Sequence, residues 1–202
     1  MTAIAQAPAL GCVVLAAGLS RRMGGEHKLL KAWRGRPLLD HALVAASASG
    51  LSAIVVVTGA RGNEVADLAS RRGLPAVHNA EFAEGMGSSI AAGVRALPPG
   101  LAGAFIALGD MPLVRPDDYV ALAAAFDAAD PAIICAPAHG GRRGHPVLFG
   151  RAHFEALAGL RGDAGAASIV KAAWRVVLVE RPTNGVLADF DTPDSFEQHP
   201  MT

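Results

Sequence analysis

Short apolar runs alternate with longer segments of helical apolar spacing along nearly the whole chain, and this alternation constrains the fold most. The apolar runs predict strands at 11–16, 53–58, 75–77, 103–108, 132–136, 146–149 and 175–179. The segments between them predict helices from Pro37 to Gly50 and over 62–72, 86–96, 116–127, 151–160 and 164–173. Strands that alternate with helices form a mostly parallel sheet covered on both faces. The sequence therefore predicts an α/β fold.

The composition is typical of a soluble globular domain. The 202 residues are 51% hydrophobic and 18% charged, with a net charge of zero, which is enough apolar material for one core. We expect a single domain over 1–202, with an ordered core from about 10 to 195. The apolar N-terminus lacks the basic start of an export signal, and no uninterrupted apolar run is long enough for a membrane span. We expect a cytoplasmic protein that binds neither membranes nor nucleic acid.

A glycine turn with a basic cluster follows the first predicted strand. It reads Leu15-Ala16-Ala17-Gly18-Leu19-Ser20-Arg21-Arg22-Met23-Gly24, and Lys28 comes four residues later. Between positions 21 and 36, six basic side chains stand against Glu26, a net charge of +5. The N–H groups of such a turn, a helix N-terminus and nearby cations all attract phosphate. The loop predicts a nucleotide site, although a glycine turn taken alone is more often a plain strand-to-helix connection.

Carboxylates occur at two places that this fold can bring to the same sheet edge. Asp110 directly follows the predicted strand 103–108, and ligands of open parallel sheets bind where strands end. A carboxylate beside a phosphate site repels it unless a cation lies between them, and Mg²⁺ suits that position. Asp110 is therefore a candidate magnesium ligand, and Asp191 completes the site if the segment 188–194 folds back. Taken alone, Asp110 fits a helix cap or turn beside Pro112 better.

Two further polar turns lie beside predicted strands. Asn79 and the glycine–serine segment 84–90 can contact a ribose or base, and N-capping of the next helix by Ser88 or Ser89 is an equal alternative. The basic turn 140–146 can bind a second anionic substrate. Within it, His145 fits a packed and hydrogen-bonded side chain better than a catalytic base.

Together these segments resemble the nucleotidyltransferases of molybdenum cofactor biosynthesis, which join a nucleoside monophosphate to molybdopterin. The resemblance spans nearly the whole chain. Besides the loop at 15–24 with Lys28, it rests on Pro37-Leu38-Leu39, Gly85-Met86-Gly87-Ser88-Ser89, Gly109-Asp110-Met111-Pro112, Arg143-Gly144-His145-Pro146, Gly162-Asp163-x-Gly165-Ala166 and Asp191-Thr192-Pro193-Asp194. The Ala-Ala-Gly at 16–18 is similar to the cytidylyl branch, whereas the guanylyl branch usually has Ala-Gly-Gly there.

The resemblance implies a Rossmann-like three-layer α/β/α fold of the nucleotide-diphospho-sugar transferase type. It implies transfer of CMP from CTP to the terminal phosphate of molybdopterin with release of pyrophosphate. The implied catalytic residues are Arg22, Lys28 and Asp110, with Mg²⁺ on Asp110 and Asp191. The nucleotide site comprises Leu15, Ala16, Ala17, Gly18, Ser20, Arg22, Lys28, Asn79, Gly85, Ser88, Ser89 and Gly109. The acceptor site comprises Arg143, Gly144, His145, Pro146 and Asp163.

Other functions share these features. A guanylyltransferase of the same family, or a nucleotidyltransferase for a sugar phosphate or an isoprenoid-precursor phosphate, would use the same loop and metal aspartate. A non-catalytic nucleotide- or cofactor-binding chaperone would keep the same fold, and pyrophosphate release distinguishes it from an enzyme. An acceptor molybdoenzyme of the xanthine dehydrogenase type is a further expected partner.

Overall fold

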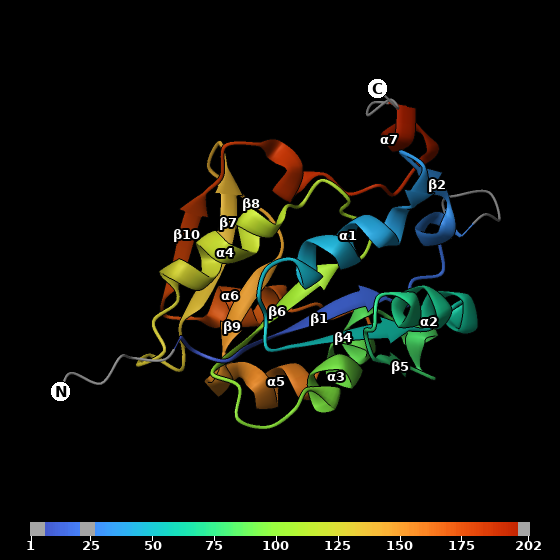
Figure 1. The fold of residues 1–202 in the computed structure, drawn as a ribbon. Helices are drawn as coiled ribbons and strands as arrows, with labels where there is room; N and C mark the ends of the chain where they lie inside the picture. The colour runs from blue at the N-terminus through green and yellow to red at the C-terminus, as the bar shows by residue number, and fades with distance from the viewer. Residues whose placement is uncertain (1–6, 21–26, 198–202) are drawn as a thin grey trace.

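One large sheet organises the computed structural model, which describes residues 7–20 and 27–197 (Figure 1). Its strand order is β10-β7-β9-β6-β1-β4-β5, with β8 paired to β7 off this path. The strands are β1 (Leu10–Ala16), β4 (Ala53–Thr58), β5 (Ala76–His78), β6 (Gly103–Leu108), β7 (Ile134–His139), β8 (Arg142–Arg143), β9 (Val147–Gly150) and β10 (Val176–Glu180). A separate antiparallel hairpin joins β2 (Ala32–Trp33) to β3 (Arg36–Pro37).

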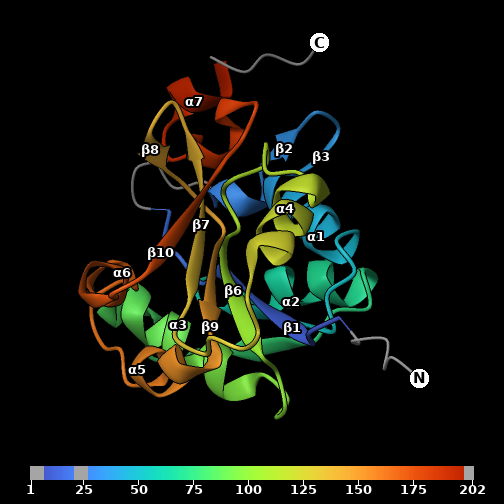
Figure 2. The ribbon, with the colours of Figure 1, turned by 90° about the vertical axis from the view of Figure 1, so that its left-hand side faces the viewer.

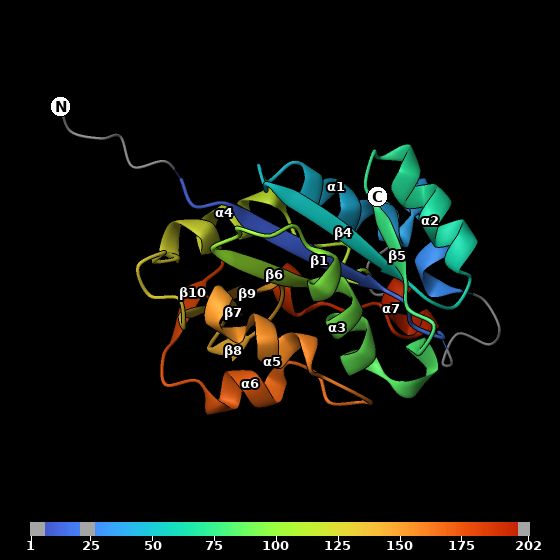
Figure 3. The ribbon, with the colours of Figure 1, turned by 90° about the horizontal axis from the view of Figure 1, so that it is seen from below.

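Helices cover both faces of the sheet (Figure 3). One face carries α1 (Leu38–Ser47), α2 (Gly62–Arg71) and α4 (Pro116–Ala125), and the other carries α3 (Met86–Ala96), α5 (Phe154–Ala158) and α6 (Ala167–Ala172). The short helix α7 (Pro193–Glu197) lies beside the β2–β3 hairpin at the end towards which β1 points (Figures 1 and 2). No helix within the described residues is long and apolar enough to cross a bilayer.

The alternation of side chains along β1 divides the core into two layers. Cys12 and Val14 belong to the apolar cluster that includes α1, α2 and α4, whereas Val13 belongs to the cluster that includes α3, α5 and α6. Successive side chains of a strand point to opposite faces, so a central strand buried on both sides must be apolar throughout. The predicted three-layer α/β fold is confirmed.

The sheet contains antiparallel pairs that surround β9. It pairs antiparallel with both β6 and β7, and β8 pairs antiparallel with β7. The connection from β7 to β9 is a short turn around 140–146, which has no room for the crossover helix that a parallel pair needs. The remaining pairs of the sheet are parallel, which agrees with the expected mostly parallel arrangement.

Several element boundaries differ from the predictions. The first long helix ends at Ser47, before Gly50, which takes a left-handed φ of +74°. The predicted helix 164–173 begins only at Ala167, because a turn with Gly162 at φ +59° precedes it. The predicted helix 151–160 is divided into a 3₁₀ turn at Arg151–His153 followed by α5. Local turn chemistry sets these ends, and apolar spacing does not report it.

Candidate functional site

A cleft of about 480 Å³ opens at the carboxyl ends of β1 and β6. The loop after β1, the loop after β6, the start of α3, the turn at 162–165 and the segment before α7 all contribute to it. Its lining residues are Leu15, Ala17, Gly18, Leu19, Ser20, Lys28, Leu29, Phe82, Ala83, Gly85, Met86, Ser89, Leu108, Asp110, Asp163, Asp189 and Asp191. The cleft lies where ligands of open α/β sheets bind.

Lys28, Asp110 and Asp191 meet in this cleft, although they are far apart in the sequence. The Nζ of Lys28 donates to Oδ2 of Asp110 at 2.5 Å and also to Oδ1 of Asp191. The Lys28 side chain is 12% exposed and that of Asp110 is 18% exposed. The backbone N–H of Phe190 donates to the carbonyl oxygen of Asp110 at 3.0 Å, which holds the C-terminal segment against the loop after β6. The segment 188–194 thus folds back onto the sheet edge.

The two carboxylates keep Lys28 charged. Burial acts to lower the pKa of Lys28, but the charge of Asp110 and the hydrogen bonds to Asp110 and Asp191 outweigh it and raise that pKa. The ammonium group therefore stands as a full positive charge between two acidic groups.

The donor set fits a hard divalent cation that also binds substrate oxygens. Oδ1 of Asp110 is buried and has no hydrogen-bond partner, so one carboxylate oxygen is available for a further ligand. No group of three or more His, Cys, Asp or Glu side chains in the described parts of the chain forms a metal cage. Mg²⁺ is commonly held by one or two carboxylates together with phosphate oxygens and water. Asp110 and Asp191 match that pattern.

The loop after β1 is closed at its ends by two hydrogen bonds. The backbone N–H of Lys28 donates to Oγ of Ser20 at 3.1 Å, and Nε2 of His27 contacts the carbonyl oxygen of Gly18 at 3.1 Å. Ser20 has a φ of +50°, a left-handed conformation that turns the chain sharply. Arg22, expected at the phosphates, lies outside the described residues.

The turn at 162–165 packs directly onto the start of α3. The N–H of Gly87 donates to the carbonyl oxygen of Gly162 at 2.8 Å. Gly85 has a φ of +128°, and a Cβ there would collide with Asp163 and Gly162. Glycine is therefore required at position 85 on both counts. Asp163, implied at the acceptor site, lies in the same cleft as the residues implied for the nucleotide.

Some residues implied at the nucleotide lie behind the cleft wall. Ala16 is buried in the core, and a Cβ on Gly109 would meet Leu39 and the carbonyl oxygen of Leu15. The buried Asn79 donates from Nδ2 to Oγ of Ser88 at 2.9 Å and to Oγ of Ser89 at 3.0 Å. Of these residues, only Ser89 lines the cleft.

The serines at the start of α3 do not cap the helix. Ser88 donates instead to the carbonyl oxygens of Glu81 and Gly85, each at 2.9 Å. The N-cap position is Gly85, and no side chain caps it. The expected alternative of N-capping by Ser88 or Ser89 is therefore wrong.

The basic turn before β9 lies outside the cleft lining, including Arg143, Gly144, His145 and Pro146. Gly144 packs against the carbonyl oxygen of Val186, and the N–H of His145 donates to that same oxygen at 2.9 Å. Burial lowers the pKa of His145, and its buried Nδ1 has no hydrogen-bond partner. This turn supports the segment that continues to Asp191.

Asp189 also lines the cleft, and it is not among the predicted site residues. Phe190 between the two aspartates is fully buried. In an extended segment, residues two apart share a side, so a buried aromatic residue flanked by two acids places both acids on the opposite side. This spacing is the signal that could have identified Asp189.

Comparisons with known proteins agree with this geometry. Residues 12–177 match the model of the family described as MobA-like NTP transferase domain. The chain is 34% identical over 144 residues to the molybdenum cofactor cytidylyltransferase of Escherichia coli K12, covering 71% of each chain. It is 29% identical over 199 residues to the nicotine blue oxidoreductase of Paenarthrobacter nicotinovorans, covering 92% of this chain and 93% of that one.

A solved structure shares the whole fold. The crystal structure of Rv0371c from Mycobacterium tuberculosis H37Rv superposes with a TM-score of 0.80 at 27% identity, covering 96% of this chain and 98% of that one. Its complex with manganese superposes with a TM-score of 0.76 at 25% identity, covering 94% and 96%. The Rossmann-like fold is therefore shared with a protein that has been solved in complex with manganese.

Proposed function

The chain belongs to the MobA-like NTP transferase family, and from this premise we propose that it is a molybdenum cofactor cytidylyltransferase. It would transfer CMP from CTP to the terminal phosphate of molybdopterin and release pyrophosphate. The observation that carries the proposal is the meeting of Lys28, Asp110 and Asp191 in one cleft at the ends of β1 and β6. The similarity to the Escherichia coli cytidylyltransferase supports the choice of substrates.

The main task of the protein in this reaction is to hold two anionic phosphate groups close together. The terminal phosphate of molybdopterin is an anion at neutral pH, so its attack needs no strong general base. It forms a bond to the α-phosphorus of CTP, and the bond to the β-phosphate breaks to release pyrophosphate. Lys28 contributes a positive charge inside the cleft, and Arg22 is the second cation that we propose. Mg²⁺ held by Asp110 and Asp191 would supply further charge neutralisation at the phosphate oxygens.

Ala17 is the residue that we propose to favour CTP over a purine nucleotide. It lines the cleft and is 4% exposed. Its carbonyl oxygen accepts a hydrogen bond from the N–H of Ala60 at 3.3 Å, so its backbone is fixed against the end of β4. Because this backbone is fixed, the Ala17 methyl group would reduce the space available for the base of the nucleotide. Ala17→Gly should therefore reduce the preference for CTP over GTP, and an unchanged preference would contradict this role.

Pyrophosphate release tests the proposed function. The purified protein is supplied with Mg²⁺ and molybdenum-loaded molybdopterin, and CTP, GTP and ATP are compared side by side. We expect release with CTP. Release with GTP alone would keep the family and reverse the nucleotide choice, whereas no release with any nucleotide would contradict the transferase and favour a binding role.

A further inference from the structure

The described basic side chains between positions 28 and 36 do not gather at one site. Lys28 lies in the cleft, but Arg34 and Arg36 are on the β2–β3 hairpin and contribute to a second hollow of about 430 Å³. Arg115, at the start of α4, joins them there. The full lining is Trp33, Arg34, Arg36, His41, Pro112, Leu113, Val114, Arg115, Thr183, Asn184 and Gly185. We call it the basic hollow.

Among the residues that the structure describes, no acidic side chain lines the basic hollow. The acid that pairs with Arg36 is Asp40, with 3.8 Å between Nη1 and Oδ2. Asp40 is already bound by Arg72, which donates to both of its carboxylate oxygens. The bidentate Arg72 largely neutralises the carboxylate of Asp40. Most of the positive charge of Arg36 therefore remains available to attract an anion.

Arg115 shows the same arrangement on the opposite wall. The acid beside it, Asp118, accepts the backbone N–H of Arg115 at 2.8 Å and the Nε of Arg181 at 2.7 Å. The Arg115 side chain is exposed, and these bonds do not neutralise it. The basic hollow therefore presents three guanidinium groups that come from two separate segments.

The hairpin fixes the two guanidinium groups on its side. Arg34 and Gly35 both have positive φ, +47° and +76°, as in the tight two-residue turns of hairpins. Arg34 stacks over the ring of Trp33, 4.4 Å from the ring centre. Trp33 is itself buried and accepts a hydrogen bond at its carbonyl oxygen from His41 at 2.9 Å. The other ring nitrogen of His41 accepts from Arg36 at 3.3 Å.

The basic hollow is built from the same chain segments as the cleft. Lys28 leads into the hairpin, Asp110 leads to Arg115, and the segment at 183–185 leads to Asp189 and Asp191. Trp33 contacts Phe190 edge-on, with 5.2 Å between the ring centres. The two sites are therefore built on the same segments, although no residue lines both of them.

We propose that the basic hollow binds a small polyphosphate anion, of which inorganic pyrophosphate is the simplest. Guanidinium groups bind phosphate oxygens two at a time, and three of them match an anion of two or more charges. The hollow has the size of small-molecule pockets, which favours a small anion over an acidic protein segment. Free pyrophosphate and the triphosphate tail of a nucleotide share this chemistry. This inference goes beyond the proposed function, because it concerns a second site.

Trp33 gives a local signal for this binding. The chain has two tryptophans, so Trp174→Phe, at a position that is 76% exposed, leaves Trp33 as the single one. The Trp174→Phe protein is titrated with pyrophosphate in EDTA, and separately with CTP and tripolyphosphate. We expect a saturable change in Trp33 emission with pyrophosphate and tripolyphosphate. A response to CTP with none to free pyrophosphate would instead assign the site to nucleotides and overturn the choice of pyrophosphate.

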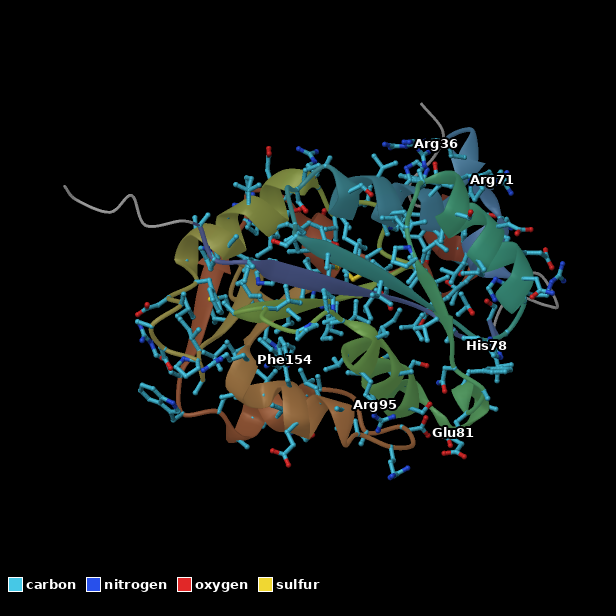
Figure 4. The ribbon with its side chains drawn as sticks, turned by 60° about the horizontal axis from the view of Figure 1, so that its bottom comes forward. Arg36, Arg71, His78, Glu81, Arg95 and Phe154 are labelled. Atoms are coloured by element: carbon cyan, nitrogen blue, oxygen red, sulfur yellow. The ribbon has the colours of Figure 1, made fainter. Side chains whose placement is uncertain are left out.

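Variants separate the basic hollow from the cleft. Arg115→Ala should raise the Kd for pyrophosphate about tenfold or more, and Arg115→Lys should restore part of it. Arg71→Ala is the matched control, since Arg71 is an exposed arginine of α2 outside the hollow (Figure 4). Lys28→Ala should leave the Trp33 signal unchanged. No saturable signal, a signal lost in Lys28→Ala, or an equal loss in Arg71→Ala would each overturn the proposal, whatever the outcome of the transfer assay.

Discussion

The cleft and the basic hollow are built from the same segments but carry opposite charge. Four aspartates line the cleft, and Lys28 is the cation that the described residues place among them. In the described part of the chain, three arginines and no acid line the hollow. After β1 and β6 the residues that come first line the cleft and those further along line the hollow, whereas after β10 this order is reversed. Charges that are neighbours in sequence are thus sorted into a candidate cation site and a candidate anion site.

Among the variants considered, removal of the Asp110 carboxylate should have the largest effect, because it takes negative charge away from the cleft. Asp110→Asn keeps the shape of the side chain but removes the charge beside Lys28 and replaces one of the two carboxylate oxygens with an amide nitrogen. We expect a loss of about 10²–10³ in kcat, in line with other groups that stabilise a transition state by charge. Pyrophosphate release at saturating Mg²⁺ measures it. Asp67→Asn, an exposed acid of α2, is the control, and a near-normal kcat in Asp110→Asn would refute the role.

Removing Lys28 should separate catalysis from cation binding. Lys28→Ala takes away the cation between Asp110 and Asp191, so kcat should fall by about 10². The two carboxylates then lack a counter-charge, and the protein without nucleotide should bind Mn²⁺ more tightly than wild type. Lys31→Ala is the control, because Lys31 lies over the ring of Phe196 and does not line the cleft. Weaker Mn²⁺ binding in Lys28→Ala would contradict the competition.

Asn79 tests whether the wall behind the cleft is structural. Its amide group bridges the hydroxyl groups of Ser88 and Ser89 while buried. Asn79→Ala leaves both hydroxyls with one partner fewer, which should lower the free energy of unfolding by about 1–3 kcal/mol. Chemical denaturation measures this loss. A drop in kcat with unchanged stability would instead place Asn79 at the nucleotide.

His41 gives the smallest effect and reports on the basic hollow. Burial lowers its pKa below 6.5, and the charges of Arg36 and Arg34 lower it further, whereas the hydrogen bond to Trp33 acts to raise it. As the pH falls through 6.5, His41 is protonated in the unfolded chain before it is protonated in the folded protein. This difference lowers the free energy of unfolding as the pH falls. Arg36→Ala should raise the pKa of His41, measured by NMR titration. An unchanged pKa of His41 would contradict the effect of the Arg36 charge on this residue of the hollow.

The sequence predicted the sheet well because apolar periodicity reports burial directly. The seven predicted strands correspond to β1, β4, β5, β6, β7, β9 and β10, each of which starts within two residues of its prediction, and the layers are as expected, whereas the two-residue strands β2, β3 and β8 were not predicted. It did not predict the antiparallel pairing of β9, which depends on the length of a turn. It also treated the arginines of the β2–β3 hairpin as part of the phosphate cluster. The positive φ of Arg34 and Gly35 turns them away, and a count of charges contains no such information.

Measuring Mn²⁺ binding is the most direct test of whether the cleft is the cation site. Mn²⁺ binding is measured by EPR in the presence of a non-hydrolysable CTP analogue, for wild type and for Asp110→Asn. We expect saturable binding by wild type and a Kd raised at least about tenfold in Asp110→Asn, since a charged ligand is lost. Equal Mn²⁺ binding by the two proteins would contradict the assignment of the cleft as the cation site.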